Sequence, residues 1–98
     1  MNENLINGQW LAGASTIQSW NPSDTRELVG EYAAADAQQM QQAVAAARAA
    51  FGRWQHTTTQ MRSDFLQRVS NQMMAQKESL GLLVSREAGK TLAEGLGE

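Results

Sequence analysis

A Gly-Lys-Thr triplet near the end of this 98-residue sequence is the pattern with the most obvious chemical potential. Gly89-Lys90-Thr91 could close a phosphate-binding loop, in which glycine backbone and a lysine hold the phosphates of a nucleotide. That loop needs an earlier glycine where Val84 stands and a buried strand before it, whereas Leu80 to Glu87 has helical spacing. We therefore interpret Gly89 as the end of a helix, with Lys90 near the negative end of the helix dipole.

Three of the glutamates and the single histidine are the other residues that could act as acids, bases or ligands. Glu78, Glu87 and Glu94 could exchange protons with a substrate, but their spacing fixes no two of them around a reacting atom. We interpret them as solvated carboxylates on helix surfaces. His56 has neither a second histidine nor a cysteine with which to bind a metal, and we expect it in a loop between two helices.

Charge and composition argue against several classes of function. The net charge is −2 and the basic residues form no stripe, so we expect no nucleic-acid partner. Trp10, Trp20 and Trp54 are then packing anchors rather than platforms for bases, and the methionines of the helix faces belong to the core. No apolar run approaches the about 18 residues of a membrane span, and the first residues lack the pattern of a secretion signal. We therefore expect a cytoplasmic protein without a membrane partner.

The elements that carry these residues fall into two parts, strands and turns over residues 1–34 and helices over residues 35–98. Leu5-Ile6 and Trp10-Leu11 flank Asn7-Gly8, the strongest short-range signal for a hairpin with a type I′ turn. Ile17 to Trp20 and Leu28 to Tyr32 are further candidate strands. The turn Asn21-Pro22-Ser23-Asp24 separates them, because the residue before proline avoids the helical region. Such short strands need a cover to be stable.

The first predicted helix begins at Asp36, which resembles the first residue of a capping box with Gln39 three positions later. Its apolar stripe consists of Met40, Val44, Ala47, Phe51 and Trp54. Gly52 and the run Thr57-Thr58-Thr59 mark the end of this helix and the start of the next.

The second predicted helix covers about Gln60 to Gln76 and begins at a cap on Thr58 or Thr59. Its apolar face contains Met61, Phe65, Leu66, Val69 and Met73. A third apolar face, with Leu80, Leu83 and Val84, either continues this helix or follows a break near Lys77. Gly89 ends that segment, and Leu92 and Leu96 begin another amphipathic stretch. The sequence stops at Glu98 inside this pattern, which we interpret as a sign of a fragment.

The order of several motifs resembles the start of the aldehyde dehydrogenase superfamily. Ile6-Asn7-Gly8-Gln9-Trp10 followed by Asn21-Pro22 is similar to that family's first hairpin and turn. Ala43 to Phe51 with Trp54 resembles its alanine-rich helix, and Arg62 with Leu66 its next helix. Arg86 to Glu94 resembles its Glu-x-Gly-Lys-Pro segment. Each motif is weak by itself, but their common order across the chain is specific.

Two departures from the family pattern stand out. The segment Ser23 to Glu27 is one residue longer than the family's turn and lacks its glycine, and Thr91 replaces the usual proline. Asn21 to Asp24, leading into Val29 to Ala33, is similar to the 2,5-dioxopentanoate (α-ketoglutaric semialdehyde) dehydrogenases.

The resemblance implies that the parent is an α/β enzyme with a Rossmann-like cofactor domain, a catalytic domain and an oligomerisation arm. In such enzymes a cysteine attacks the aldehyde, hydride passes to NAD or NADP, and a glutamate activates water. This chain has no cysteine, and Lys90 is not the family's cofactor-binding lysine. We therefore assign no catalytic, cofactor-binding or metal-binding residue to it, and we expect no cofactor on the fragment itself.

Two functions remain open at this stage. In the first, residues 1–98 are an α+β fragment, the N-terminal part of the cofactor-binding domain, without the catalytic domain. This fragment is an inactive scaffold of a homo-oligomeric enzyme that oxidises an aldehyde, with 2,5-dioxopentanoate as a candidate, to the carboxylic acid. Its partners are the remainder of the parent enzyme and, through it, the small aldehyde substrate. In the second, the chain is a small stand-alone helical module for interaction or oligomerisation. The coding sequence after Glu98 distinguishes the two.

Overall fold

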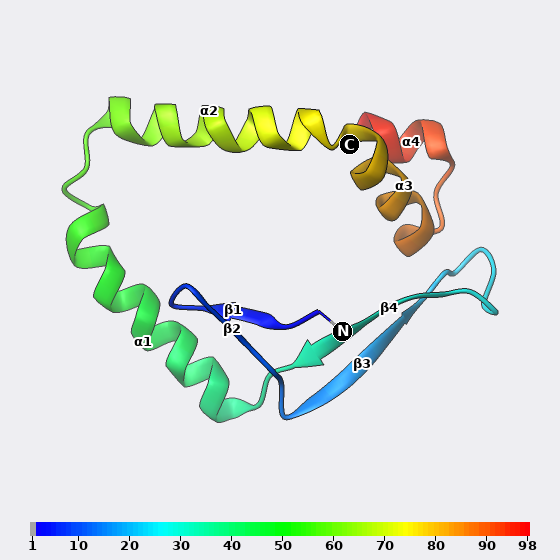
Figure 1. Ribbon diagram of the computed structural model, residues 1–98, viewed down its shortest axis with the longest axis horizontal. Coiled ribbons are helices and arrows are strands. Elements are labelled where there is room, and N and C mark those ends of the chain that lie inside the picture. Colours follow the sequence, from blue (N-terminus) through cyan, green and yellow to red (C-terminus); the bar gives the residue numbers. More distant parts are fainter. Residues whose placement is uncertain (1) are drawn as a thin grey trace. The chain divides into compact units, whose positions relative to one another are not determined.

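The computed structural model describes residues 2–98, which form short strands followed by helices (Figure 1). The α+β class predicted from the sequence is confirmed. The elements are β1 (Asn4–Ile6), β2 (Gln9–Leu11), β3 (Ser15–Trp20), β4 (Leu28–Ala34), α1 (Ala37–Trp54), α2 (Thr59–Ala75), α3 (Lys77–Ala88) and α4 (Leu92–Gly97).

The described chain divides into two compact units, which do not coincide with its strand part and its helical part. The first unit contains residues 2–18 and 30–57, and the second contains residues 19–29 and 58–98. The strands form two separate pairs, β1 with β2 and β3 with β4, so no larger sheet is present in residues 2–98.

The hairpin of the first unit has the predicted turn. Asn7 and Gly8 have φ values of 51° and 76°, as the two central positions of a type I′ turn require. The strands pair antiparallel, with Leu5 opposite Trp10. The side chain of Gln39 fastens this hairpin to the start of α1, because it accepts a hydrogen bond from Asn4 at 2.8 Å and donates one to the carbonyl of Ala12 at 2.9 Å.

Strands β3 and β4 are both longer than the sequence predicted. Ser15 and Thr16 extend β3, and Ala33 and Ala34 extend β4. Ser15, Ala33 and Ala34 carry little strand preference of their own, and backbone pairing with a neighbour decides their conformation, whereas Thr16 is a residue that strands favour. Asn2 adds a parallel bridge to β4, since its amide donates to Glu31 at 3.0 Å and its carbonyl accepts from Ala33 at 2.8 Å.

Helix α1 begins at the predicted cap. The amide of Gln39 donates to the carboxylate of Asp36 at 2.8 Å. The predicted capping box is wrong in its second half, because the Gln39 side chain bonds to the hairpin instead of returning to Asp36. Gly52 does not end the helix either: it lies within α1, which continues to Trp54 and is capped by Gln55.

Helices α2, α3 and α4 are separated by distinct local signals. Thr58 caps α2 by accepting from the amide of Met61 at 3.2 Å. A break at Gln76 separates α2 from α3, which settles the alternative that the sequence left open. Gly89, with φ 69°, ends α3 in the left-handed conformation, as predicted. Thr91 and Glu94 then form a full capping box that starts α4 and that the sequence analysis missed.

Helices α3 and α4 lie side by side (Figure 1) and approach through two buried glycines. A Cβ atom on Gly81 would lie 2.6 Å from Cδ2 of Leu96. A Cβ atom on Gly95 would collide with the backbone carbonyl oxygen of Gly81. Both positions therefore depend on the absence of a side chain.

Burial is where the sequence-based expectation is wrong. Ala33 is the only buried hydrophobic residue in the described chain. Trp10, Trp20 and Trp54, expected as packing anchors, are 65%, 46% and 47% exposed. The helix stripes expected as core are exposed too: Met40, Val44, Phe51, Met61, Phe65, Leu66, Val69 and Met73. Periodicity identifies the apolar face of a helix, but residues 2–98 contain too little chain to cover these faces.

None of the helices in residues 2–98 combines the length and the apolar character that a membrane crossing requires.

Candidate functional site

The Gly-Lys-Thr triplet links the end of α3, at Gly89, to the start of α4, at Thr91. Lys90 donates its backbone N–H to the carbonyl of Ser85 at 3.0 Å, and the Ser85 hydroxyl donates back to the carbonyl of Lys90 at 2.6 Å. The ammonium of Lys90 pairs with the carboxylate of Glu98. A phosphate loop follows a strand and presents free N–H groups at the start of the next helix. This triplet instead follows a helix, α3, and the N–H of Thr91 at the start of α4 already donates to the Glu94 carboxylate at 3.0 Å. This segment therefore does not fit a nucleotide phosphate.

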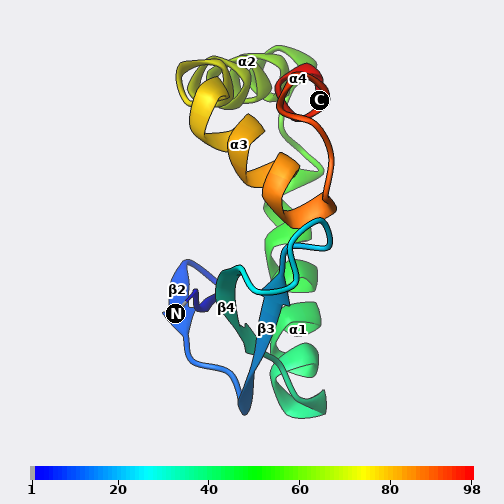
Figure 2. The same ribbon diagram turned by 90° about the vertical axis from the view of Figure 1, so that its right-hand side faces the viewer.

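The turn between β3 and β4 lies against the C-terminal end of α3, as Figure 2 shows. Nε of Arg86 donates to Oε1 of Glu27 at 2.6 Å, and Nδ2 of Asn21 donates to Oε2 of Glu27 at 2.7 Å. The hydroxyl of Ser23 donates to the carbonyl of Gly89 at 3.0 Å. We call these five residues the turn clamp. It joins the Asn-Pro motif to the Gly-Lys motif, which are far apart in the sequence.

The carboxylates near this clamp are adapted to carry charge rather than to donate protons. The hydrogen bond from Asn21, followed by that from Arg86, lowers the pKa of Glu27. The N–H and hydroxyl of Thr91 lower the pKa of Glu94, and Arg26 lowers the pKa of Asp24. A general acid at neutral pH needs a raised pKa. These groups therefore serve structure.

The three glutamates singled out in the sequence are not brought together around a common point. Glu78 lies in the first turn of α3, and Glu87 accepts a hydrogen bond from Ser19 at 3.4 Å. Glu94 forms the capping box of α4. Glu87 and Glu94 are exposed on helix surfaces, as the sequence predicted. Each also accepts a hydrogen bond, Glu87 from the Ser19 hydroxyl and Glu94 from the N–H and hydroxyl of Thr91.

His56 lies in the turn between α1 and α2, where the sequence predicted it, and is exposed. Among the residues that the structure describes, no three histidine, aspartate or glutamate side chains are grouped so that they could hold a metal ion.

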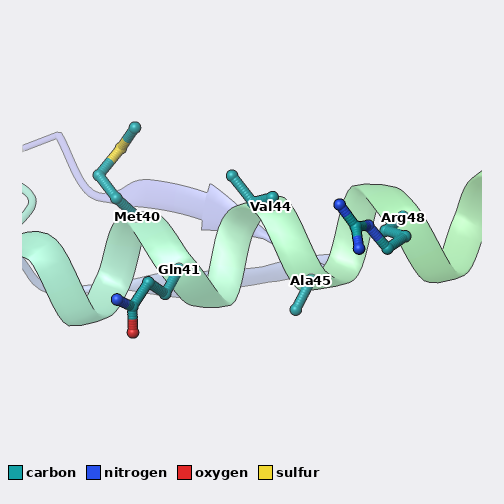
Figure 3. A pocket seen from close by; sticks show the side chains of 5 residues that line it. All are labelled: Met40, Gln41, Val44, Ala45 and Arg48. Atoms are coloured by element: carbon teal, nitrogen blue, oxygen red, sulfur yellow. The ribbon is translucent and has the colours of Figure 1, made fainter.

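Two pockets of the first unit are shallow and lined mainly by apolar atoms. One lies along α1 between Met40, Gln41, Val44, Ala45 and Arg48 (Figure 3). The other lies between the hairpin and α1, and its lining is Leu5, Ile6, Asn7, Ala43, Ala46, Ala47 and Ala50. A small-molecule site would combine enclosure with several convergent polar groups, which neither place offers.

The second unit offers a larger uncovered surface. Every residue of α2 except Arg62 is exposed. Leu66, Met73 and Met74 are 63%, 58% and 64% exposed, and Met61 and Val69 are exposed on the same helix. Several exposed apolar side chains on one helix are typical of an interaction surface. The most prominent surface feature of α2 is thus its row of exposed apolar side chains.

Comparison with known proteins relates this chain to one family of enzymes. Residues 10–98 match the sequence profile of the aldehyde dehydrogenase family. The chain is 33% identical over 97 residues to the α-ketoglutaric semialdehyde dehydrogenase of Bacillus subtilis. It is 36% identical over 98 residues to the mitochondrial succinate-semialdehyde dehydrogenase of Arabidopsis thaliana. The alignments cover 97% and 98% of this chain but only 20% and 18% of those proteins.

Solved structures show the same fold. An NAD-dependent aldehyde dehydrogenase from Sinorhizobium meliloti superimposes with a TM-score of 0.92 and 35% identity over 98% of this chain and 20% of that one. A betaine aldehyde dehydrogenase from Staphylococcus aureus, solved in complex with NAD+, gives 0.91 and 26% over the same shares. The chain thus spans about a fifth of the length of its relatives. It belongs to the aldehyde dehydrogenase family.

Proposed function

We propose that this chain is the N-terminal part of the cofactor-binding domain of a cytoplasmic, homo-oligomeric NAD(P)-dependent aldehyde dehydrogenase. The semialdehyde dehydrogenases among its relatives, and the motif around Asn21-Pro22, favour a semialdehyde such as 2,5-dioxopentanoate as substrate. The product would be the corresponding carboxylic acid. NAD or NADP would accept the hydride, and residues outside this chain would bind that cofactor.

Within that enzyme we assign the chain a scaffolding role. The observation that carries it is the exposure of most large apolar side chains in residues 2–98, together with the internal bonding of the polar motifs. The helices would pack on the remainder of the parent enzyme through α1 and α2. The turn clamp would fix the course of the chain between β3 and β4.

A chimeric enzyme tests this function. This chain replaces the matching fifth of the B. subtilis α-ketoglutaric semialdehyde dehydrogenase, and NADH and NADPH formation is measured with 2,5-dioxopentanoate and with succinate semialdehyde. We expect a folded, active chimera, and no reduction of either cofactor by the chain alone. A soluble chimera without activity, or reduction by the chain alone, would contradict the proposal.

The second candidate function is a stand-alone helical interaction module, which the exposed faces of α1 and α2 also fit. It predicts a defined, stable oligomer of this chain and a stop codon directly after Glu98. The scaffolding role instead predicts that the reading frame continues after Glu98 and encodes a cysteine and a glutamate for catalysis.

A further inference from the structure

The turn residue Asn7 combines three properties that favour chemical modification of its own side chain. It is followed by Gly8, both residues are exposed, and a Cβ atom on Gly8 would meet nothing within 4 Å. Glycine leaves the backbone nitrogen open to approach, because no side chain shields it. We propose that Asn7 is a site of deamidation and isoaspartate formation in the folded chain, independently of the function proposed above.

The reaction needs only water as a co-reactant. The backbone nitrogen of Gly8 forms a bond to Cγ of Asn7, the bond from Cγ to Nδ2 breaks, and the nitrogen's proton leaves with the amide group as ammonia. The resulting succinimide ring then takes up one water molecule. Opening at one carbonyl gives aspartate, and opening at the other gives isoaspartate, in which the main chain runs through Cβ and Cγ. No electrons are gained or lost.

The hydrogen bonds distinguish Asn7 from the other asparagines. Asn2, Asn4 and Asn21 each donate from Nδ2, to Glu31, Gln39 and Glu27 respectively. Asn71 accepts from Gln67 inside α2. Among the described residues, no hydrogen bond holds the side-chain amide of Asn7.

The backbone nitrogen that follows each asparagine differs as well. Pro22, after Asn21, has no N–H to lose. Gln72, after Asn71, lies inside a helix, where its N–H bonds to the preceding turn. In the described hydrogen bonds Gly8 donates to nothing. The hairpin around it has only three residue pairs, so it opens readily and lets Asn7 leave its positive φ.

The two products affect the hairpin differently. Asp-Gly suits a type I′ turn as well as Asn-Gly does, so the aspartate form keeps the pairing of Ile6 with Gln9. Isoaspartate lengthens the main chain of a two-residue turn, so the loop no longer fits and this pairing is lost. Each conversion also adds one negative charge to a chain of net charge −2.

Mass spectrometry of the whole chain tests the proposal. The folded chain is kept in mildly alkaline buffer for several days, and samples are analysed by tandem mass spectrometry and by labelling with an isoaspartate-specific methyltransferase. We expect a gain of about 1 Da at Asn7 and methyl label at the same residue. Asn4, Asn21 and Asn71 stay unchanged over that period and serve as internal controls.

A parallel sample unfolded in urea supplies the reference rate. If Asn7 converts there and stays intact in the folded chain, the turn protects it and the proposal is wrong. Equal conversion of Asn4 or Asn71 in the folded chain would also overturn it. The variant Asn7→Gln should lose the label, because its longer side chain would have to close a larger ring. In the isoaspartate form, separated by ion exchange, the amide of Gln9 should exchange faster than in the unmodified chain.

Discussion

The guanidinium of Arg86 donates a hydrogen bond to the carboxylate of Glu27 at 2.6 Å, although 59 positions separate the two residues. This contact, with the hydroxyl of Ser23 on the carbonyl of Gly89, makes one structural unit of two motifs that look independent in the sequence. The glycine and lysine of the second motif therefore need no ligand to explain them.

The lowered pKa of Glu27 predicts an acid-sensitive second unit. Because the folded-state pKa lies below the usual 4.5, the stabilisation is complete above pH 4.5 and is lost as the pH falls through the folded value. Glu27→Gln should flatten the dependence of unfolding on pH in this acidic range. Urea unfolding followed by circular dichroism between neutral and acidic pH measures it.

Asp24 provides the control for this experiment. Its partner Arg26 is only two residues away and can reach it in the unfolded chain as well. Asp24→Asn should therefore change the pH dependence less than Glu27→Gln. An equal or larger effect would show that Glu27 does not govern the acid response.

Gly89→Ala should destabilise the junction of α3 and α4. The left-handed conformation alone costs an alanine about 1–2 kcal/mol, and its Cβ would lie 2.8 Å from Cγ of Pro22. Gly52→Ala is the matched control, because it lies inside α1 with open space around it and should stabilise that helix by about 1 kcal/mol. Hydrogen exchange of the α3 and α1 amides reads out both variants. If both substitutions change the stability of their helices in the same direction, the role given to Gly89 at the end of α3 is wrong.

Gly95→Ala should separate α3 from α4, because the added methyl group would collide with the backbone of Gly81. Overpacking of this kind costs about 1–3 kcal/mol. The amides of α4 should then exchange faster, while Gly97→Ala, which meets nothing within 4 Å, should leave them unchanged. Equal protection in the two variants would show that the close approach is unimportant.

The apolar face of α2 should make the chain associate with itself in solution. Leu66→Glu with Met73→Glu should weaken this association by about tenfold or more, since each side chain contributes roughly 1–3 kcal/mol when covered. Gln67→Glu with Asn71→Glu adds the same two charges to the polar side of the helix and is the control. Sedimentation velocity over a range of concentrations measures the difference. If the unsubstituted chain is monomeric at every concentration, the prediction is wrong.

Local signals predicted those features of the fold that a few neighbouring residues decide. The Asn7-Gly8 turn, the caps at Asp36 and Thr58, and the helix end at Gly89 all follow from donors and steric freedom within one turn of chain. The capping box of Thr91 and Glu94 carries a similar signal, serine or threonine followed three residues later by glutamate, and the sequence could have revealed it.

Burial and long-range contacts could not be predicted in the same way. A stripe of apolar residues shows which face of a helix avoids water, but not which segment covers it. The pairing of Glu27 with Arg86 has no local signature, because both residues are equally plausible as solvated surface charges. Ser15, Ala33 and Ala34, at the ends of β3 and β4, depend on a neighbouring strand rather than on their own preferences.

Within residues 2–98 only one hydrophobic residue, Ala33, is buried, and this sparse burial affects how the chain responds to temperature. The heat-capacity change of unfolding comes mainly from apolar surface that becomes hydrated, and less such surface is covered here than in a compact domain of the same length. The free-energy curve of the lone chain should therefore be nearly flat, with a broad and weak calorimetric transition. When a partner covers the faces of α1 and α2, the same chain should acquire a curved stability profile and a sharp heat-absorption peak.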